Sequence, residues 1–173
     1  MICPRCQQGV QQLSDGLCPY CQYPCGEFHR KVTAVQMVLG AIFASTLVYG
    51  AVVAILELAV EYTPPGDGLP EHVLGTALLV ASVMPALVLW RLAAGSLSAG
   101  DPDQMQRGLI MMAAGAETPA VCGLVAYLVA GSLMWFVILL GVSWLLFLRL
   151  GMSLPEYLNT MRDAIGRSPS SQL

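Results

Sequence analysis

The sequence predicts an all-α integral membrane protein with four transmembrane helices, and its composition, hydropathy and charge placement are the observations behind this. Hydrophobic residues make up 56% of the 173 residues and charged residues 11%, against about 25% charged in soluble proteins. Four apolar segments are each long enough to cross the ~30 Å hydrocarbon core of a bilayer. The expected spans are about residues 33–60, 72–91, 108–130 and 133–149.

The first two spans are separated by a segment that breaks helices strongly. Residues 35–56 carry no charge, and about 20 residues are enough for one crossing. Residues 61–71 then contain three prolines and two glycines, so a loop is expected there. The second span follows, with a kink expected at Pro85, and ends at Arg91.

The apolar stretch from residue 108 to residue 148 is too long for a single crossing. Gly131 and Ser132 supply small residues for a tight reversal in its middle. We therefore divide the stretch there into a third and a fourth span, with Arg149 closing the fourth.

The basic residues test this division, because Lys and Arg favour the cytoplasmic side of short loops. All eight fall on one side of a four-span map, whereas three or five spans would scatter them over both sides. We expect a multi-pass protein of a bacterial cytoplasmic membrane, with both termini cytosolic. The eight residues are Arg5, Arg30, Lys31, Arg91, Arg107, Arg149, Arg162 and Arg167.

The tail, residues 151–173, is expected to form one short amphipathic helix over about 154–165. Ser153 and Glu156 match a capping box, and Gly166 is a stop signal. Its apolar face would lie on the membrane surface, dock on a partner protein, or pack against the protein's own cytoplasmic ends. That face consists of Leu154, Leu158, Met161 and Ile165.

Residues 1–31 form a polar, cysteine-rich head with two C-x-x-C turns. Cys3 and Cys6 belong to the first turn, and Cys18 and Cys21 to the second; eleven residues separate the two turns. Two such turns supply the four thiolates of a tetrahedral zinc site. The segment resembles the short zinc ribbons at the ends of many bacterial proteins, although glutamine stands where glycine often follows each turn in that family.

A zinc site is the favoured interpretation of these four cysteines. The alternatives are a site for iron or another metal and a redox-active dithiol. Disulfides are disfavoured because cytosolic thiols stay reduced. Four thiolates leave no open coordination position, so the zinc would be structural and would fold a head too small for a core of its own. Cys25 is a fifth thiol, either a bystander or a replacement ligand.

Glu117 is the one charge well inside a span, about nine residues from Gly108. A central carboxylate costs at least ~2.5 kcal/mol on insertion scales, so the group should be protonated, paired or hydrated. One interpretation is a protonated carboxyl that hydrogen-bonds a neighbouring helix, with Ser82 and Ser143 at similar depth. The other is a group that binds and releases a proton or ion.

Residues 113–126 resemble the carboxylate-bearing helix of the c-subunit of rotary ATP synthases, with small residues before and after the acid. The resemblance implies that Glu117 carries the transported proton or sodium ion and that Thr118 is its neighbour. It covers only about 14 residues and indicates a similar local environment, not a rotor.

No catalytic serine set, phosphate loop or intramembrane metalloprotease motif is present in the sequence, so we expect a non-enzymatic protein. The first functional hypothesis is a scaffold or assembly factor with a structural zinc ribbon; the alternative is proton or ion handling by Glu117. We expect lipid as its surroundings, no nucleic acid, and a protein partner or a second copy of the chain.

Overall fold

The computed structural model describes residues 2–10, 16–59, 62–64, 70–98 and 101–166. The described residues form four long helices and no strand. The helices are α1 (Cys25–Ala59), α2 (Glu71–Ser98), α3 (Pro102–Ala130) and α4 (Leu133–Ile165). Each is long and apolar enough to cross a membrane, as the hydropathy of the sequence predicts.

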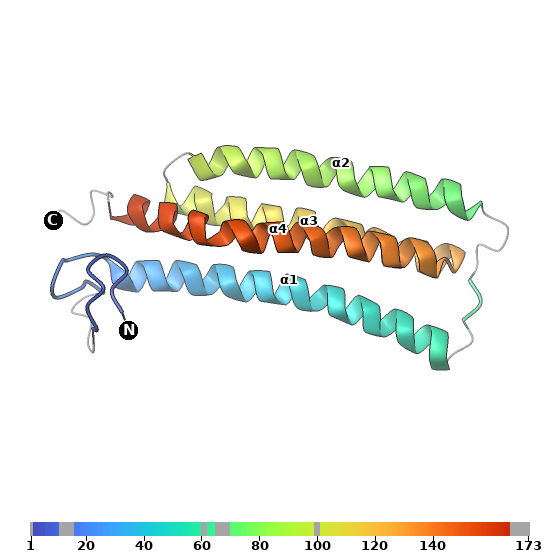
Figure 1. Cartoon of the computed structure of the whole chain (residues 1–173), viewed down its shortest axis with the longest axis horizontal. Helices are drawn as coiled ribbons and strands as arrows, with labels where there is room; N and C mark the ends of the chain where they lie inside the picture. The colour runs from blue at the N-terminus through green and yellow to red at the C-terminus, as the bar shows by residue number, and fades with distance from the viewer. Residues whose placement is uncertain (1, 11–15, 60–61, 65–69, 99–100, 167–173) are drawn as a thin grey trace.

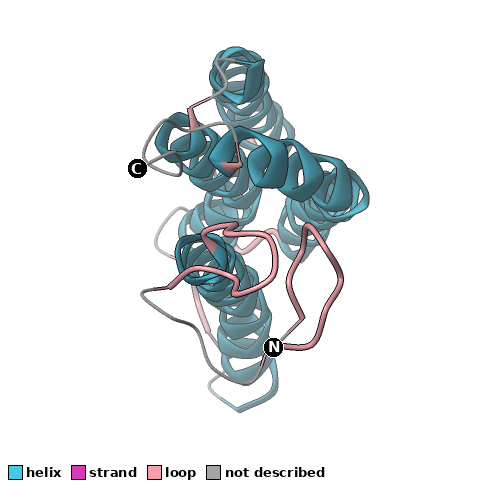
Figure 2. Cartoon of the chain, turned by 90° about the vertical axis from the view of Figure 1, so that its left-hand side faces the viewer, coloured by secondary structure: helices cyan, strands magenta, loops and turns pink. Residues whose placement is uncertain are grey.

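The four helices lie roughly side by side and alternate in direction, so that the cysteine segment and the end of α4 lie at the same end of the bundle (Figure 1). We call this the head end. Figure 2, viewed from that end, shows the cysteine segment as loops and turns in front of the helices. Within the described part of this segment, Ile2 and Gly9 form an isolated antiparallel β-bridge.

Helix α3 is the centre of the bundle and contacts each of the other three helices. Its small residues allow this close approach: Gly115 faces Ala86 of α2, and Gly123 faces Phe136 and Leu139 of α4. Helix α1 packs mainly on α3, and five of its 35 residues are buried. Helices α2 and α4 therefore pack tightly on α3, and α1 packs on α3 less extensively.

The ends of α3 follow familiar capping rules. Asp101 accepts a hydrogen bond from the backbone N–H of Asp103 at 3.0 Å, with Pro102 in the first turn. At the other end Gly131 adopts a left-handed φ of 66°, and its N–H bonds the carbonyl oxygen of Tyr127 at 2.8 Å. The predicted reversal between the third and fourth spans is at this glycine.

The helices extend beyond the expected spans at the head end. Helix α1 begins at Cys25 rather than near residue 33, so the last residues of the predicted head are helical. Helix α2 continues to Ser98 and α3 starts at Pro102. Hydropathy marks the apolar part of a helix, whereas backbone hydrogen bonding continues until a cap or a breaker ends it.

The prediction of a separate helix in the tail is wrong, because the tail residues 151–165 belong to α4. Helix α4 continues without a break through Ser153 and Pro155 to Ile165, so Ser153 is not an N-cap. Its hydroxyl instead donates to the carbonyl oxygen of Arg149 at 3.1 Å. The 33 residues of α4 span about 50 Å at 1.5 Å per residue. The tail residues 151–165 are therefore the last part of one long helix, and this part lies beside the head.

Candidate metal centre and interhelical carboxyl cluster

The four cysteines of the two C-x-x-C turns come together at the head end, and their sulfur atoms all lie within 4.8 Å of one another. The Cys3 and Cys21 sulfurs are 3.6 Å apart, and those of Cys6 and Cys18 are 3.7 Å apart. Four sulfurs at ~2.3 Å from one tetrahedral zinc ion would be about 3.8 Å from each other. A disulfide would need about 2.05 Å. The cluster could hold a metal ion.

The two turns have the same backbone geometry. The N–H of Gln7 bonds the carbonyl oxygen of Cys3, and the N–H of Gln22 bonds that of Cys18, both at 2.9 Å. Both glutamines adopt a left-handed φ, 59° and 55°. These are the positions where glycine often follows a zinc knuckle, so glutamine takes the glycine conformation there at a cost of about 1 kcal/mol each.

The thiols of the cluster differ in how readily they ionise. Burial opposes ionisation of Cys3, but the backbone N–H groups of Cys6 and Arg5 lower the pKa of its thiol to about 6. Burial and, to a smaller extent, the Cys3 sulfur raise the pKa of Cys21 to about 12. One thiolate therefore forms readily while its neighbour resists a second charge. A bound metal ion would supply the charge that lets all four ionise.

Cys25 lies beside this cluster. It is fully buried at the start of α1, and its sulfur is 3.4 Å from that of Cys3. Burial raises the pKa of Cys25 to about 12, so it is a thiol that can donate to the Cys3 sulfur. The group of four sulfurs that lie within 4.8 Å of one another does not include it.

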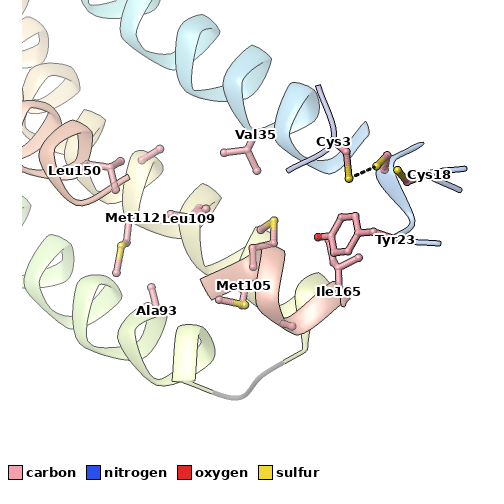
Figure 3. Packing of buried hydrophobic residues seen from close by; sticks show 14 of the residues in the cluster. Cys3, Cys18, Tyr23, Val35, Ala93, Met105, Leu109, Met112, Leu150 and Ile165 are labelled. Carbon is pink, nitrogen blue, oxygen red and sulfur yellow. Dashed lines mark hydrogen bonds between the residues drawn. The ribbon is translucent and has the colours of Figure 1, made fainter. Parts of the chain in front are cut away.

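Tyr23 joins the head to the end of α4. Its ring is buried, and its hydroxyl donates to the carbonyl oxygen of Arg162 at 2.7 Å. Figure 3 shows the ring beside Ile165, with Met105 of α3 close by. Met161 and Ile165 are both buried in the same cluster as Cys3 and Cys18. The apolar face of the tail therefore packs, in part, against the protein's own head.

Lys31 connects α1 to the first turn of α3. Its side chain is 9% exposed and lies 3.6 Å from the carboxylate of Glu27, and its ammonium group also contacts Asp103. The hydrogen bond and charge of Lys31 hold the pKa of Asp103 below its usual range. This contact fixes the head end of α1 on the helix that forms the centre of the bundle.

Glu117 points from α3 toward α1. Its Oε1 atom contacts the hydroxyl of Ser45 and accepts a hydrogen bond from the hydroxyl of Tyr49 at 2.8 Å. Ser45 and Tyr49 lie one helical turn apart on α1. The carboxyl is therefore bonded to a neighbouring helix, as the first interpretation of the sequence expects.

The expected partners of Glu117 are different from the observed ones. Ser82 donates to the carbonyl oxygen of Leu79, and Ser143 donates to that of Ala116. Thr118 bonds back to Ala114 at 3.0 Å. Ser45 and Tyr49 are two of the few polar residues in the uncharged stretch 35–56, but no local signal in the sequence shows that they face Glu117.

Comparisons with known proteins add no assignment. Searches against protein-family models, curated proteins and solved structures find no match to this chain. The resemblance of the head to zinc ribbons and that of residues 113–126 to the c-subunit helix therefore stay predictions.

Proposed function

We propose that the protein is a non-enzymatic scaffold or assembly factor of the bacterial cytoplasmic membrane, with a structural zinc ribbon on its cytosolic side. The observation that carries this proposal is the grouping of four cysteine sulfurs within 4.8 Å of one another, with two of the pairs at 3.6 and 3.7 Å. All four ligands come from the protein, so the metal would organise the chain and would not bind a substrate.

The position of the head explains what such a metal would organise. Tyr23 follows the second C-x-x-C turn by two residues and bonds α4, the last helix of the bundle. Cys25 begins α1, the first helix. Folding of the head by zinc would thus hold the residues before α1 against the last turns of α4. The rigid cytosolic surface formed in this way is where we expect a protein partner or a second copy of the chain.

Complementation in the organism that encodes the chain tests this function. A strain lacking the protein receives the wild type, Cys18→Ser or Glu117→Gln. We expect Cys18→Ser to fail while Glu117→Gln restores the wild-type phenotype. Cys122→Ser is the matched control, because Cys122 lies in α3, outside the cysteine cluster. Restoration by Cys18→Ser together with failure of Glu117→Gln would overturn the proposal.

The second candidate function is proton or ion handling by Glu117. The convergence of two hydroxyl groups on one carboxyl between apolar helices favours it. Carbodiimide labelling of Glu117 in native membranes would test it, with Glu117→Gln as the control. Labelling that falls as the pH is raised would support an accessible, exchanging carboxyl. Absence of labelling at every pH would exclude this function.

A further inference from the structure

The contacts around Glu117 need one more hydrogen than the hydroxyl groups supply. The Ser45 oxygen lies 2.6 Å from the carbonyl oxygen of Ile42 and also contacts Oε1 of Glu117. Tyr49 makes the third contact. A carbonyl oxygen and an ionised carboxylate only accept hydrogen bonds, and each hydroxyl has one hydrogen. Two hydrogens cannot fill three contacts.

Thr46, the residue after Ser45, makes a similar pair of contacts in which every hydrogen bond has a hydrogen. Thr46 donates to the carbonyl oxygen of Phe43 at 2.7 Å, as Ser45 does to Ile42. Its oxygen then accepts a hydrogen bond from the indole N–H of Trp144 on α4, at 3.2 Å. Each hydroxyl thus donates to its own helix and meets a group on another helix. For Ser45 that group is the carboxyl of Glu117, which can donate only when it is protonated.

No cation is available to stabilise an ionised Glu117 at this depth. The apolar segments 32–59, 72–90, 108–130 and 133–148 contain no lysine or arginine. A carboxylate without a counter-ion is expensive between such segments. The other titratable groups of these segments are Tyr49 and Glu57 on α1, His72 on α2, and Cys122 and Tyr127 on α3.

We propose that the carboxyl of Glu117 is a proton-binding site, and that its bound proton is donated to Ser45 and fastens α1 to α3. The hydrogen of Ser45 is then free for Ile42, that of Tyr49 goes to Glu117, and all three contacts are filled. Five residues of α1 are buried, and the contact of Ser45 with Glu117 adds to the polar contacts that Lys31, Thr46 and Tyr49 make with α3 and α4. Release of the proton leaves one contact without a hydrogen and loosens α1.

This inference does not depend on the scaffold function, and it deepens the second candidate by naming the proton as the ligand. The proton-binding inference and the proton-handling function can fail separately. A protonated Glu117 that carbodiimide never labels would exclude proton handling while leaving the inference intact.

Infrared spectroscopy of the full chain in lipid bilayers, with ¹³C-labelled glutamate carboxyls, tests the proposal. We expect a band of a protonated carboxylic acid at neutral pH that is absent in Glu117→Gln and present in Glu57→Gln, the control for the other glutamate of these segments. Absence of that band in the wild type, or its survival in Glu117→Gln, would overturn the proposal.

Neighbouring substitutions test the direction of the hydrogen bond. Ser45→Ala removes the acceptor and should shift the Glu117 band, whereas Thr46→Ala, one residue further on, should leave it unchanged. Raising the pH until the band disappears should lower the thermal stability of the wild type but not of Glu117→Gln, whose amide still donates. An unshifted band in Ser45→Ala, or equal pH dependence in the wild type and Glu117→Gln, would contradict the donor role.

Discussion

Replacing Gly123 with alanine should destabilise the bundle, because the new methyl group would be crowded between α3 and α4. A Cβ atom there would lie 3.0 Å from Cβ of Leu139 and 3.2 Å from the carbonyl oxygen of Phe136. Neither is the end of a flexible side chain, so α3 and α4 themselves would have to move apart by a few tenths of an ångström. Overpacking of this kind costs about 1 to 3 kcal/mol, and a loss of about 2 kcal/mol lowers the folding equilibrium constant about 30-fold.

Two other glycines provide matched controls for this substitution. A Cβ at Gly115 would have its nearest neighbours at 3.6 Å, which is ordinary contact, and a Cβ at Gly141 would meet nothing within 4 Å. Gly141→Ala should be neutral or stabilising by up to about 1 kcal/mol through helix propensity. The assay is helix loss followed by circular dichroism in detergent as the denaturant is increased. Equal stability of Gly123→Ala and Gly115→Ala would refute the packing argument.

Three further predictions concern the head end. Gln7→Gly should relieve the left-handed backbone conformation of a non-glycine residue and strengthen metal binding several-fold in chelator competition, whereas weaker binding would contradict the left-handed turn. Tyr23→Phe removes the buried bond to Arg162, which contributes about 1 kcal/mol; proteolysis of the head should become faster, and an unchanged rate would count against this contact. Lys31 lowers the pKa of Asp103 in the folded protein. The ion pair therefore stabilises the fold at pH values above the pKa of Asp103 in the unfolded chain, about 3.9, and this stabilisation is lost as the pH falls through the pKa of Asp103 in the folded protein. Thermal denaturation between pH 6 and pH 3 should therefore show a smaller acid loss in Asp103→Asn than in the wild type; an equal loss would argue against the pair.

The sequence predicts the helical part of the fold well, because long apolar segments and proline-rich or glycine-rich breaks are local signals. Gly131 is an example, since a small residue in the middle of a long apolar stretch marks the turn that the structure contains. The continuation of α4 past Ser153 is different. A capping box and a proline in the first turn favour a new helix start, but neither prevents an existing helix from continuing through them.

The cysteine cluster is also predictable from the sequence. Each C-x-x-C turn places two cysteines close together by itself, and only eleven residues separate the two turns. The partners of Glu117 are not predictable, because Ser45 and Tyr49 are 72 and 68 residues away in the sequence. Which helix faces the carboxyl depends on helix rotation and packing. The position of Tyr23 against Arg162, 139 residues later, is a tertiary contact of the same kind.

Native mass spectrometry of the chain, purified from membranes in mild detergent, tests the central claim most directly. We expect one zinc ion per chain in the wild type and in Cys122→Ser, and none in Cys18→Ser. Zinc binding would connect the sulfur geometry of the head to the proposed structural role. A wild-type chain that carries no metal, or that has lost the mass of two hydrogens for each disulfide formed between these cysteines, would contradict the account.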